Sequence, residues 1–499
     1  MTDVNKASPD RAPLWTAAEA LAATGGHGPD TWEATGVSID TRSLVAGDLF
    51  VALKDQRDGH DFVGDALAKG AAAALVTHRP DGVPEDAPLL IVDDVLKGLE
   101  ALGVDSRKRL VSAHVIGVTG SVGKTGVKEM LRACLSGSGA THAPVKSFNN
   151  HWGVPLTLAR MPRDTAYAAI EMGMNHPGEI GPLSRLASPD AAIITTIAPV
   201  HMAAFDNVEG IARAKAEIFE GLIEGGAAIL PRDNEHYEIL ANAARERGAR
   251  IISFGSHSEA DAHMESTRVT SAATVVKASL HGRPLVFKIA APGAHLAMNA
   301  LAALAAVDAV GGDLARATMA LSSWSAPDGR GARVRIALGA GAIDGHIDLI
   351  DESYNANPLS MRAALAVLAA AQPTDAIGRI ERGRRIAFLG DMLELGPDEI
   401  AMHAGLADAA ELAATDTVHT CGPLMKHLHE ALPREKRGKW FENSAEMAAS
   451  ARRVLDAGDV AMVKGSLGSR MAAVVNTIKT MGDVTSGKAA AAVRPDEGA

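Results

Sequence analysis

Short apolar runs alternate with longer stretches of helical spacing along most of the chain, and glycine- or proline-marked turns separate them. Apolar strands that alternate with helices are typical of α/β domains, in which helices cover both faces of a mostly parallel sheet. A chain of 499 residues predicts about three domains of ordinary size. We expect domains over residues 1–110, 111–325 and 326–484, followed by a disordered tail over residues 485–499.

The same pattern predicts individual elements. A short helix is expected over residues 15–23 and another over residues 208–222. The predicted strands cover residues 49–53, 72–77, 89–92, 165–170, 190–197, 347–350, 385–389, 417–420 and 460–463.

Residues 113–131 form an apolar run that breaks into a glycine-rich turn and resumes with helical spacing. This order predicts a strand, a phosphate-binding loop and a helix, because glycines let successive N–H groups turn toward an anion at the positive end of the helix dipole. Lys124 would contact the outer phosphates, and the Thr125 hydroxyl would coordinate Mg²⁺. A simple glycine turn would not explain Gly-Lys-Thr at a helix start. The predicted nucleotide loop consists of Gly120, Ser121, Val122, Gly123, Lys124 and Thr125.

The loop departs from the strict phosphate-loop spacing. Val118 stands five positions before Gly123, where that pattern has a glycine, and Gly117 lies one residue too far back.

Charges of both signs are interspersed, and a net charge of −11 comes without a basic block, so nucleic acid is not an expected partner. The charged run over residues 106–109 is interpreted as a solvated boundary rather than a binding patch. Cys134 and Cys421 form no metal or redox spacing, which suits a reducing compartment. No signal-peptide core and no apolar run of about 18 residues is found, so we expect a cytoplasmic protein without a membrane span.

Polar residues follow two predicted strands of the central domain. Glu171 ends the strand over residues 165–170, and His201 follows the strand over residues 190–197. Ligands collect beyond the carboxyl ends of parallel strands, so both residues should lie at the same sheet edge as the phosphate loop. They would hold Mg²⁺ there or be satisfied by loop backbone, and the histidine is the weaker candidate because Mg²⁺ prefers oxygen.

Lys215 interrupts the apolar stripe of the helix over residues 208–222, at a position that faces inward. On spacing alone, a snorkelling side chain or pairing with a buried acid is the favoured interpretation.

Polar positions also mark the second half of the chain. Asn299 lies one helical turn after His295, and Arg330 ends a proline- and glycine-marked linker where it could contact phosphate. Asn357 can cap a helix that begins at Pro358. Three predicted strand ends in the last domain, over residues 351–358, 390–394 and 464–466, form a second candidate site edge.

These residues indicate an ATP-using, Mg²⁺-dependent enzyme of three α/β domains and leave its acceptor open. The motifs resemble those of the Mur ligases of peptidoglycan synthesis over about residues 30–480. The resemblance rests, in this order, on the phosphate loop, Asn149-Asn150, Gly153-Val-Pro155, Glu171-Met-Gly-Met-Asn175, His201, residues 212–219, Gly293 with His295 and Asn299, Asp351, Tyr354-Asn-Ala-Asn-Pro358 and residues 389–396.

The resemblance implies a central phosphate-loop domain with a parallel sheet, flanked by a smaller N-terminal α/β domain and a C-terminal Rossmann-like α/β domain. It also implies roles for individual residues. Thr125, Glu171, His201 and Lys215 match metal positions, and Lys215 matches a carbamylated lysine. The implied catalytic residues are Lys124, Asn150, His201 and Lys215; the implied ATP contacts beyond the loop are Asn299, Arg330 and Asp351; the implied substrate contacts are Asp40, Thr41, Arg42, Asn355, Asn357 and Asp391, with residues 58–62 beside the uridine.

The reaction implied by the resemblance joins D-alanyl-D-alanine to UDP-N-acetylmuramoyl-tripeptide, through an acyl phosphate, in a monomeric protein. Leu359 follows Asn-Pro where the member that adds the third amino acid carries arginine, which favours the dipeptide-adding member. Two positions depart from the family pattern: Gly126, where a second hydroxyl is frequent, and Leu467, where arginine is common.

Three alternatives stay open. A folylpolyglutamate synthase-like ligase would share the phosphate loop and the lysine helix but should lack the N-terminal uridine segment. A phosphate-loop kinase or regulatory NTPase would share the loop alone, and a structural cell-wall scaffold would need neither.

Overall fold

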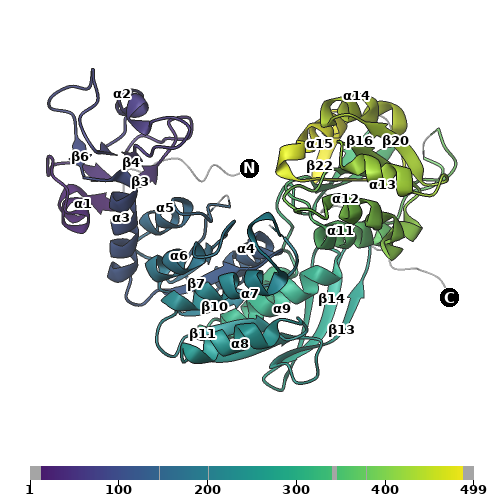
Figure 1. Ribbon diagram of the computed structural model, residues 1–499, viewed down its shortest axis with the longest axis horizontal. Coiled ribbons are helices and arrows are strands. Elements are labelled where there is room, and N and C mark those ends of the chain that lie inside the picture. The colour runs from purple at the N-terminus through teal and green to yellow at the C-terminus, as the bar shows by residue number, and fades with distance from the viewer. Residues whose placement is uncertain (1–12, 145–146, 201, 340–344, 378, 487–499) are drawn as a thin grey trace, which may run out of the picture.

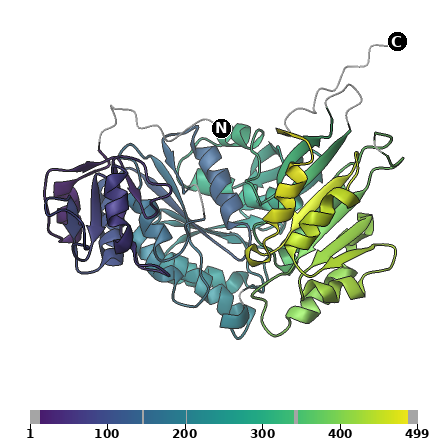
Figure 2. The same ribbon diagram turned by 90° about the horizontal axis from the view of Figure 1, so that it is seen from above.

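The computed structural model describes residues 13–144, 147–200, 202–339, 345–377 and 379–486. Three sheets, each with its own helices, follow one another along the chain, and we call them the N-terminal, central and C-terminal domains. The two outer domains stand at opposite ends of the central one (Figures 1 and 2). The predicted three-domain α/β class is confirmed. Within the described ranges, no helix has the length and apolar character needed to cross a bilayer.

The N-terminal domain is built on a parallel sheet of order β3-β4-β5-β6. A small antiparallel pair, β1 with β2, precedes it. The elements are β1 Trp15–Thr16, α1 Ala17–Thr24, β2 Glu33–Ala34, β3 Gly36–Ser38, β4 Asp48–Val51, the 3₁₀ segment η1 Gly59–Phe62, α2 Val63–Ala68, β5 Ala73–Val76, β6 Leu89–Ile91 and α3 Val95–Arg109.

The N-terminal domain is packed firmly onto the central one. Leu156 and Ala159, from the central helix α5 (Gly153–Ala159), belong to the N-terminal hydrophobic core. The Trp15 indole N–H donates to the Ala159 carbonyl at 2.9 Å. At the end of α3, Arg107 forms a largely buried ion pair with Asp190 at 3.0 Å. Shared apolar burial with directional bonds joins the two domains into one unit.

The central sheet has the strand order β15-β14-β13-β12-β11-β10-β7-β9-β8. Strands from β8 to β13 are parallel, and β14 and β15 continue the sheet antiparallel. The strands are β7 His114–Thr119, β8 Thr141–His142, β9 Tyr167–Glu171, β10 Ala191–Ile194, β11 Ala227–Pro231, β12 Arg250–Gly255, β13 Ala262–Val269, β14 Thr274–Leu280 and β15 Arg283–Ile289.

Helices cover both faces of this sheet. Helices α4, α9 and α10 pack on one face and α5 to α8 on the other. Most of α9 is buried, which explains its alanine-rich, nearly all-apolar sequence. Beyond α5, the helical elements are α4 Lys124–Leu135, α6 Ile180–Ala187, η2 Met202–Ala204, α7 Val208–Ala216, η3 Glu217–Gly221, α8 Tyr237–Glu246, α9 Ala294–Ala309 and α10 Leu314–Leu321.

The C-terminal sheet has the order β20-β19-β18-β21-β17-β16-β22, with β16 and β22 antiparallel at one edge. Helices α11 to α13 cover one face, and α14 and α15 the other. The strands are β16 Ala332–Ala337, β17 His346–Glu352, β18 Arg385–Gly390, β19 Thr417–Cys421, β20 Arg437–Phe441, β21 Val460–Lys464 and β22 Asp483–Ser486. The helical elements are α11 Pro358–Ala370, α12 Glu399–Ala404, η4 Gly405–Asp408, η5 Ala410–Ala414, α13 Met425–Ala431, α14 Ser444–Val454, η6 Leu467–Ser469 and α15 Ala472–Lys479.

The structure contains strands that the sequence pattern did not predict, among them β8, β11, β12, β16 and β20. The predicted helix over residues 208–222 is α-helical only to Ala216 and continues as the 3₁₀ segment η3. Strands β13 to β15 form antiparallel hairpins in a region where no strand was predicted. Strand β22 includes Thr485 and Ser486, which the sequence analysis placed in the tail, because these residues pair with β16. Residues 487–499 of the predicted tail lie outside the described residues.

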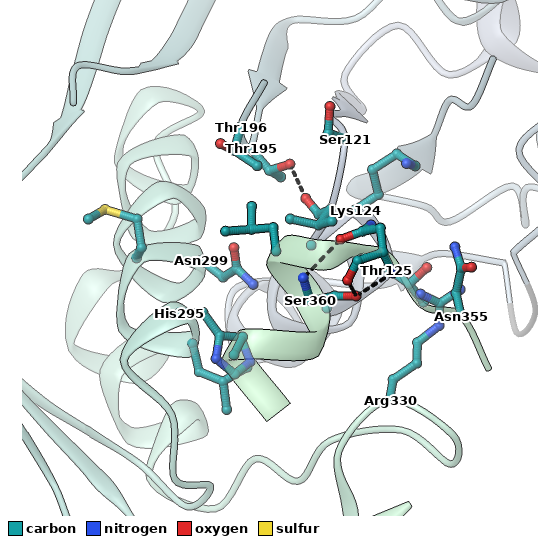
Figure 3. Close-up of a pocket in the computed structure, with 18 of the residues that line it drawn as sticks. Ser121, Lys124, Thr125, Thr195, Thr196, His295, Asn299, Arg330, Asn355 and Ser360 are labelled. Atoms are coloured by element: carbon teal, nitrogen blue, oxygen red, sulfur yellow. Dashed lines mark hydrogen bonds between the residues drawn. The ribbon is translucent and has the colours of Figure 1, made fainter. Parts of the chain in front are cut away.

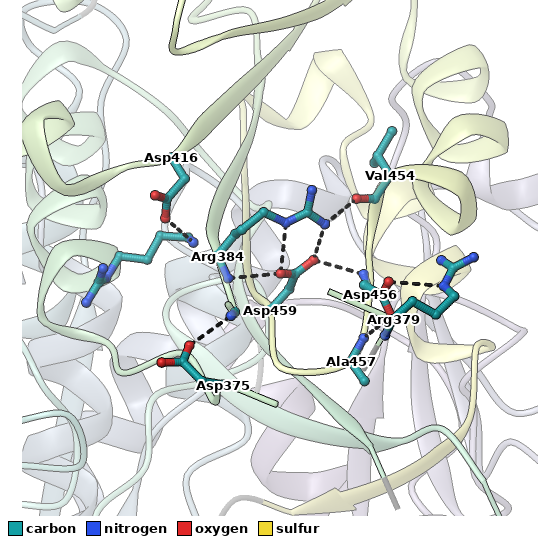
Figure 4. Close-up of polar contacts among 10 residues, drawn as sticks. Asp375, Arg379, Arg384, Asp416, Val454, Asp456, Ala457 and Asp459 are labelled. Carbon is teal, nitrogen blue, oxygen red and sulfur yellow. Dashed lines mark hydrogen bonds and ion pairs between the residues drawn. The ribbon is translucent and has the colours of Figure 1, made fainter. Parts of the chain in front are cut away.

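A buried aspartate organises one end of the C-terminal sheet (Figure 4). The Asp459 side chain is fully buried and accepts hydrogen bonds from Arg384 Nη2 at 2.6 Å and Nε at 3.1 Å, and from the backbone N–H groups of Arg384 at 3.0 Å and Asp456 at 2.8 Å. It therefore ties the strand starts of β18 and β21 together.

We expect Asp459→Ala to lower the free energy of unfolding of this domain by about 2–4 kcal/mol. This loss of stability is smaller than the full cost of breaking a buried ion pair, because Arg384 is one-third exposed and water can hydrate it. Chemical denaturation monitored by circular dichroism measures the loss. Asp65→Ala, at an exposed pair with Lys69, is the control and should leave the midpoint unchanged. An unchanged midpoint for Asp459→Ala would show that this network contributes nothing to stability.

Candidate active site

The phosphate loop lies between β7 and α4, and its glycines are required by its shape. Gly120 has φ +146°, and a Cβ there would stand 1.9 Å from Thr195 Oγ1. Gly123 has φ +88°, and a Cβ there would stand 2.9 Å from Asn299 Oδ1. Only glycine combines these backbone angles with such close neighbours. The predicted strand, loop and helix are therefore present, although the spacing departs from the strict motif.

Two cations flank the loop. Lys124 Nζ donates to the Gly120 carbonyl at 2.6 Å. Burial lowers the pKa of Lys124, the negative charge of Glu171 opposes that shift, and the positive charge of Arg330 adds to it. Arg330 also donates to Ser147 Oγ at 3.1 Å and lies 4.0 Å over the Tyr354 ring. Two positive side chains beside the glycine-rich turn at the start of α4 make a site for the phosphates of a nucleotide.

Glu171 stands beside the loop as predicted. It is almost fully buried at the end of β9, where Oε2 accepts from Thr125 Oγ1 at 2.9 Å and Oε1 accepts from Asn149 Nδ2 at 2.8 Å. A carboxylate and a hydroxyl next to a phosphate site are the oxygen donors that Mg²⁺ prefers. In the described part of the chain, no cluster of three or more His, Cys, Asp or Glu side chains could hold a metal, so an ion here would also depend on phosphate oxygens. His201, the other predicted ligand on a strand end, lies outside the described residues.

Lys215 is buried in α7, with only 1% of its surface exposed, which rules out the snorkelling interpretation. Burial lowers its pKa well below the ordinary value, and the positive charge of Lys124 lowers it further. The amine therefore lies within the electrostatic field of the phosphate loop and favours its neutral form.

A cavity of about 570 Å³ lies between the central and C-terminal domains (Figure 3). His295 and Asn299 line it from α9, and the first turn of α11 lines it from the other domain. That turn begins with a capping box in which Asn357 and Ser360 bond each other's backbone N–H groups. The predicted site residues on this wall are Ser121, Val122, Gly123, Lys124, Thr125, Glu171, Asn299, Arg330, Asn355 and Asn357.

Several predicted residues lie elsewhere. Asn150 Oδ1 accepts from the Gly153 N–H at 2.9 Å and so starts α5, while the neighbouring Asn149 lines the cavity. Asp391 Oδ1 accepts from the Met425 N–H at 2.7 Å, and burial raises its pKa. One side-chain oxygen of each residue therefore already accepts a hydrogen bond from a backbone N–H group.

The other predicted residues outside the cavity wall are Gly120, Asp351, Lys215, Asp40, Thr41 and Arg42. Asp351 is buried and accepts from the Ser353 N–H and hydroxyl at 3.1 and 2.7 Å. Asp40 and Arg42 form an ion pair at 2.7 Å in the N-terminal domain, on the loop after β3. The arginine side chain is 88% exposed.

Sequence reasoning missed part of the wall. Phe254, Leu296 and Trp324 give the cavity an apolar section, and Glu352 and Lys464 contribute charges from the C-terminal domain. These two charged residues were not missed, because they lie within the strand ends over residues 351–358 and 464–466 that were predicted as a second candidate site edge. Phe254, Leu296 and Trp324 carried no signal, because the sequence pattern does not distinguish an apolar residue that lines a cavity from one in the core.

Family models match most of the chain in order. The Mur ligase family catalytic domain matches residues 33–106, the Mur ligase middle domain residues 118–307, and the Mur ligase glutamate ligase domain residues 335–467. The order agrees with the three domains of the structure.

Named relatives are similar to this chain over nearly its full length. The chain is 36% identical over 451 residues to the UDP-N-acetylmuramoyl-tripeptide–D-alanyl-D-alanine ligase of Escherichia coli, covering 89% of this chain and 94% of that protein. The ligase of the same name from Bacillus subtilis is 34% identical over 447 residues, covering 89% and 93%. The crystal structure of MurF from Acinetobacter baumannii is 28% identical with a TM-score of 0.79, covering 94% of this chain and 99% of that one. With its phosphate loop, buried lysine and three domains, this chain belongs to the Mur ligase family.

Proposed function

We propose that this protein joins D-alanyl-D-alanine to UDP-N-acetylmuramoyl-tripeptide, with release of ADP and phosphate, as the last cytoplasmic step of peptidoglycan precursor synthesis. The names of the relatives support this substrate pair. The structural observation that carries the proposal is the cavity itself. One wall is a phosphate loop beside a buried carboxylate, and the other is the strand-end edge of a second α/β domain. ATP chemistry and an acceptor can thus meet in one place.

The proposed reaction has two steps. ATP phosphorylates the terminal carboxylate of the UDP-linked tripeptide, and the dipeptide amine then attacks the acyl phosphate. Lys124, Arg330 and the loop N–H groups hold the phosphates and offset the charge that develops on them. The C-terminal domain brings the amine to the acyl carbon, so its position relative to the central domain sets the reaction distance.

Mg²⁺ fits the oxygen-rich corner formed by Thr125 and Glu171, with His201 as a further proposed ligand. When bound, it would neutralise charge on the transferring phosphoryl group. Lys215 is proposed to carry a carbamate, because a buried amine with a lowered pKa is neutral enough to react with CO₂. The positive charges of Lys124 and of a bound Mg²⁺ would stabilise the resulting carbamate anion.

Asn149 is proposed to orient Glu171 toward this corner. Asn149→Ala removes the hydrogen bond to Oε1, and we expect activity or apparent Mg²⁺ affinity to fall about 10–100-fold, as when other partners of metal ligands are removed. Asn150→Ala removes only a helix-start bond and should cost about 1 kcal/mol of stability. Mg²⁺ titration of both variants distinguishes them. A larger activity loss in Asn150→Ala than in Asn149→Ala would support the sequence-based prediction that Asn150 is catalytic.

The N-terminal domain is proposed to hold the uridine nucleotide through the exposed loop of Asp40, Thr41 and Arg42. Asn355 and Asn357 are proposed to face the substrate from the C-terminal side of the cavity, and Asp391 to support that edge through the start of α13. Asn299, Arg330 and Asp351 are proposed to serve ATP. We propose domain boundaries near residues 110 and 325, in the connections between α3 and β7 and between α10 and β16.

We propose a cytoplasmic monomer. The reaction consumes ATP, which the cytoplasm supplies. One chain contributes both described walls of the cavity, so a second copy is not needed to complete it.

A folylpolyglutamate synthase-like activity is the alternative ligase. A bifunctional folylpolyglutamate and dihydrofolate synthase shares the fold with a TM-score of 0.54 at 18% identity, which shows the fold alone. The family match over residues 33–106 favours the Mur substrate. ADP release measured against a panel of acceptors tests the choice. ADP that appears only with glutamate and a folate, or without any amine, would reject the dipeptide ligase.

A further inference from the structure

The C-terminal domain presents one ion pair to the cavity. Glu352 ends β17 and Lys464 ends β21, and the two residues are direct partners in the parallel register of these strands. Lys464 Nζ lies 3.3 Å from Glu352 Oε2 and donates to the Asn355 carbonyl at 2.9 Å. The lysine side chain is 2% exposed and the glutamate 14%, yet both line the cavity.

The described wall of the cavity holds three carboxylates, and their bonding differs. Both oxygens of Glu171 accept hydrogen bonds, from Thr125 and Asn149. Both oxygens of Asp233 accept backbone N–H groups, from Ser256 and His257. Glu352 uses Oε2 for Lys464, and no described residue donates to its Oε1. Glu352 is therefore the carboxylate with an oxygen left for a ligand.

Three titratable groups lie near Glu352, two on neighbouring strands of its own domain and one across the cavity. Lys464 lies on the neighbouring strand β21, Arg333 on β16, and His295 across the cavity on α9. Burial lowers the pKa of His295, so the imidazole is mostly neutral. Lys464 supplies the positive charge that a buried carboxylate needs, and it leaves Oε1 unengaged.

We propose that Glu352 is the general base of the ligation step and takes a proton from the ammonium group of the acceptor dipeptide. This inference rests on the proposed function. A free α-amino group has a pKa of about 8, so the dipeptide reaches the site mostly as an ammonium ion that cannot attack. Proton transfer gives the neutral amine and a protonated Glu352. The amine nitrogen then bonds to the acyl carbon and the carbon–oxygen bond to phosphate breaks. The second nitrogen proton leaves with phosphate, and Glu352 returns its proton to water.

Lys464 acts as a positioning residue in this proposal. It fixes Glu352 and, through the Asn355 carbonyl, the loop that leads into α11. Ser466 supports the same loop, since its hydroxyl donates to the Ala356 carbonyl at 3.3 Å and accepts from the Leu393 N–H at 2.9 Å. The three strand-end loops of this domain are thereby held together behind the carboxylate.

Glu352→Gln tests the proposal because it keeps the shape of the side chain and removes its basicity. With D-alanyl-D-alanine at pH 7 we expect kcat to fall about 100-fold, in the range general bases contribute. The loss should shrink as pH rises through the amine pKa, because solution then supplies the neutral amine. Hydroxylamine is already mostly unprotonated at pH 7, so hydroxamate formation from the acyl phosphate should stay within about twofold of wild type. Asp348→Asn is the matched control and should keep both activities, because Asp348 lies on β17 like Glu352 and forms an ion pair with Arg335 of the neighbouring strand β16.

The results distinguish the general-base role of Glu352 from the proposed ligase function. If the wild-type protein makes no dipeptide adduct at all, the proposed function fails. If it does, equal losses of ligation and hydroxamate in Glu352→Gln show a structural ion pair only and overturn the general base. Normal ligation in this variant, or a loss that does not change with pH, overturns it as well. Lys464→Arg should restore most of the activity that Lys464→Met loses, because arginine can still hold Glu352.

Discussion

Replacement of Lys124 by alanine should lower kcat about 10³-fold or more while the protein stays folded. The ammonium group lies in the phosphate loop, bonded to the Gly120 carbonyl, and packs no apolar core. Its contribution is charge stabilisation of the transferring phosphoryl group, for which the removal of one preorganised donor typically costs about 10²–10³ in rate. The loss of a full positive charge places the expected effect at or above the upper end.

Steady-state ADP release measures the Lys124 effect, with circular dichroism and thermal melting as checks of folding. Lys97→Ala on the exposed face of α3 is the control and should leave turnover unchanged. Turnover of Lys124→Ala within tenfold of wild type would remove this lysine from phosphate chemistry.

Replacement of Lys215 by alanine should abolish turnover, and small carboxylic acids should partly restore it. The side chain is buried in α7, and both burial and Lys124 lower its pKa, so a bare ammonium there is unfavourable. Carbamylation would convert the buried amine of Lys215 into an anion that offsets the positive charges of Lys124 and the metal. Formate or acetate can enter the space left by the alanine and return a negative charge. Removal of CO₂ from the wild-type enzyme should lower activity until bicarbonate is added.

Lys124→Ala provides the matched control for rescue. It also lacks a lysine near the same loop, but an added acid would bring the wrong charge, so activity should not return. Full activity in Lys215→Ala, or a plain amine at this position in an active ternary complex, would contradict the carbamate.

The nucleotide half of the site was predictable because its signals are local. The loop glycines, Lys124 and Thr125 lie within six consecutive positions, and the strand-end rule placed Glu171 beside them across many intervening residues. Lys215 stood out because a charge interrupted an apolar stripe.

Other parts of the fold and the site were harder to predict, because they depend on which groups the backbone bonds. Sequence cannot tell which of Asn149 and Asn150 starts α5 and which turns to the cavity. Asp391 has the residue type of a ligand contact, yet it bonds the start of α13. The hairpins β13 to β15 were not predicted, because the polar residues at their exposed positions are also typical of loops. In the structure, β14 alternates buried and exposed residues along its length, as expected for a strand with one face toward solvent.

The central claim is that the chain forms an amide through an acyl phosphate. The most direct measurement uses UDP-N-acetylmuramoyl-tripeptide in which both oxygens of the terminal carboxylate are ¹⁸O, together with ATP and D-alanyl-D-alanine. A carboxylate oxygen that attacks the γ-phosphorus departs with phosphate when the amine attacks the acyl carbon. Mass spectrometry should therefore find one ¹⁸O in each phosphate released, in equal amounts with ADP and the dipeptide-extended product. Unlabelled phosphate alongside normal product would contradict the acyl phosphate.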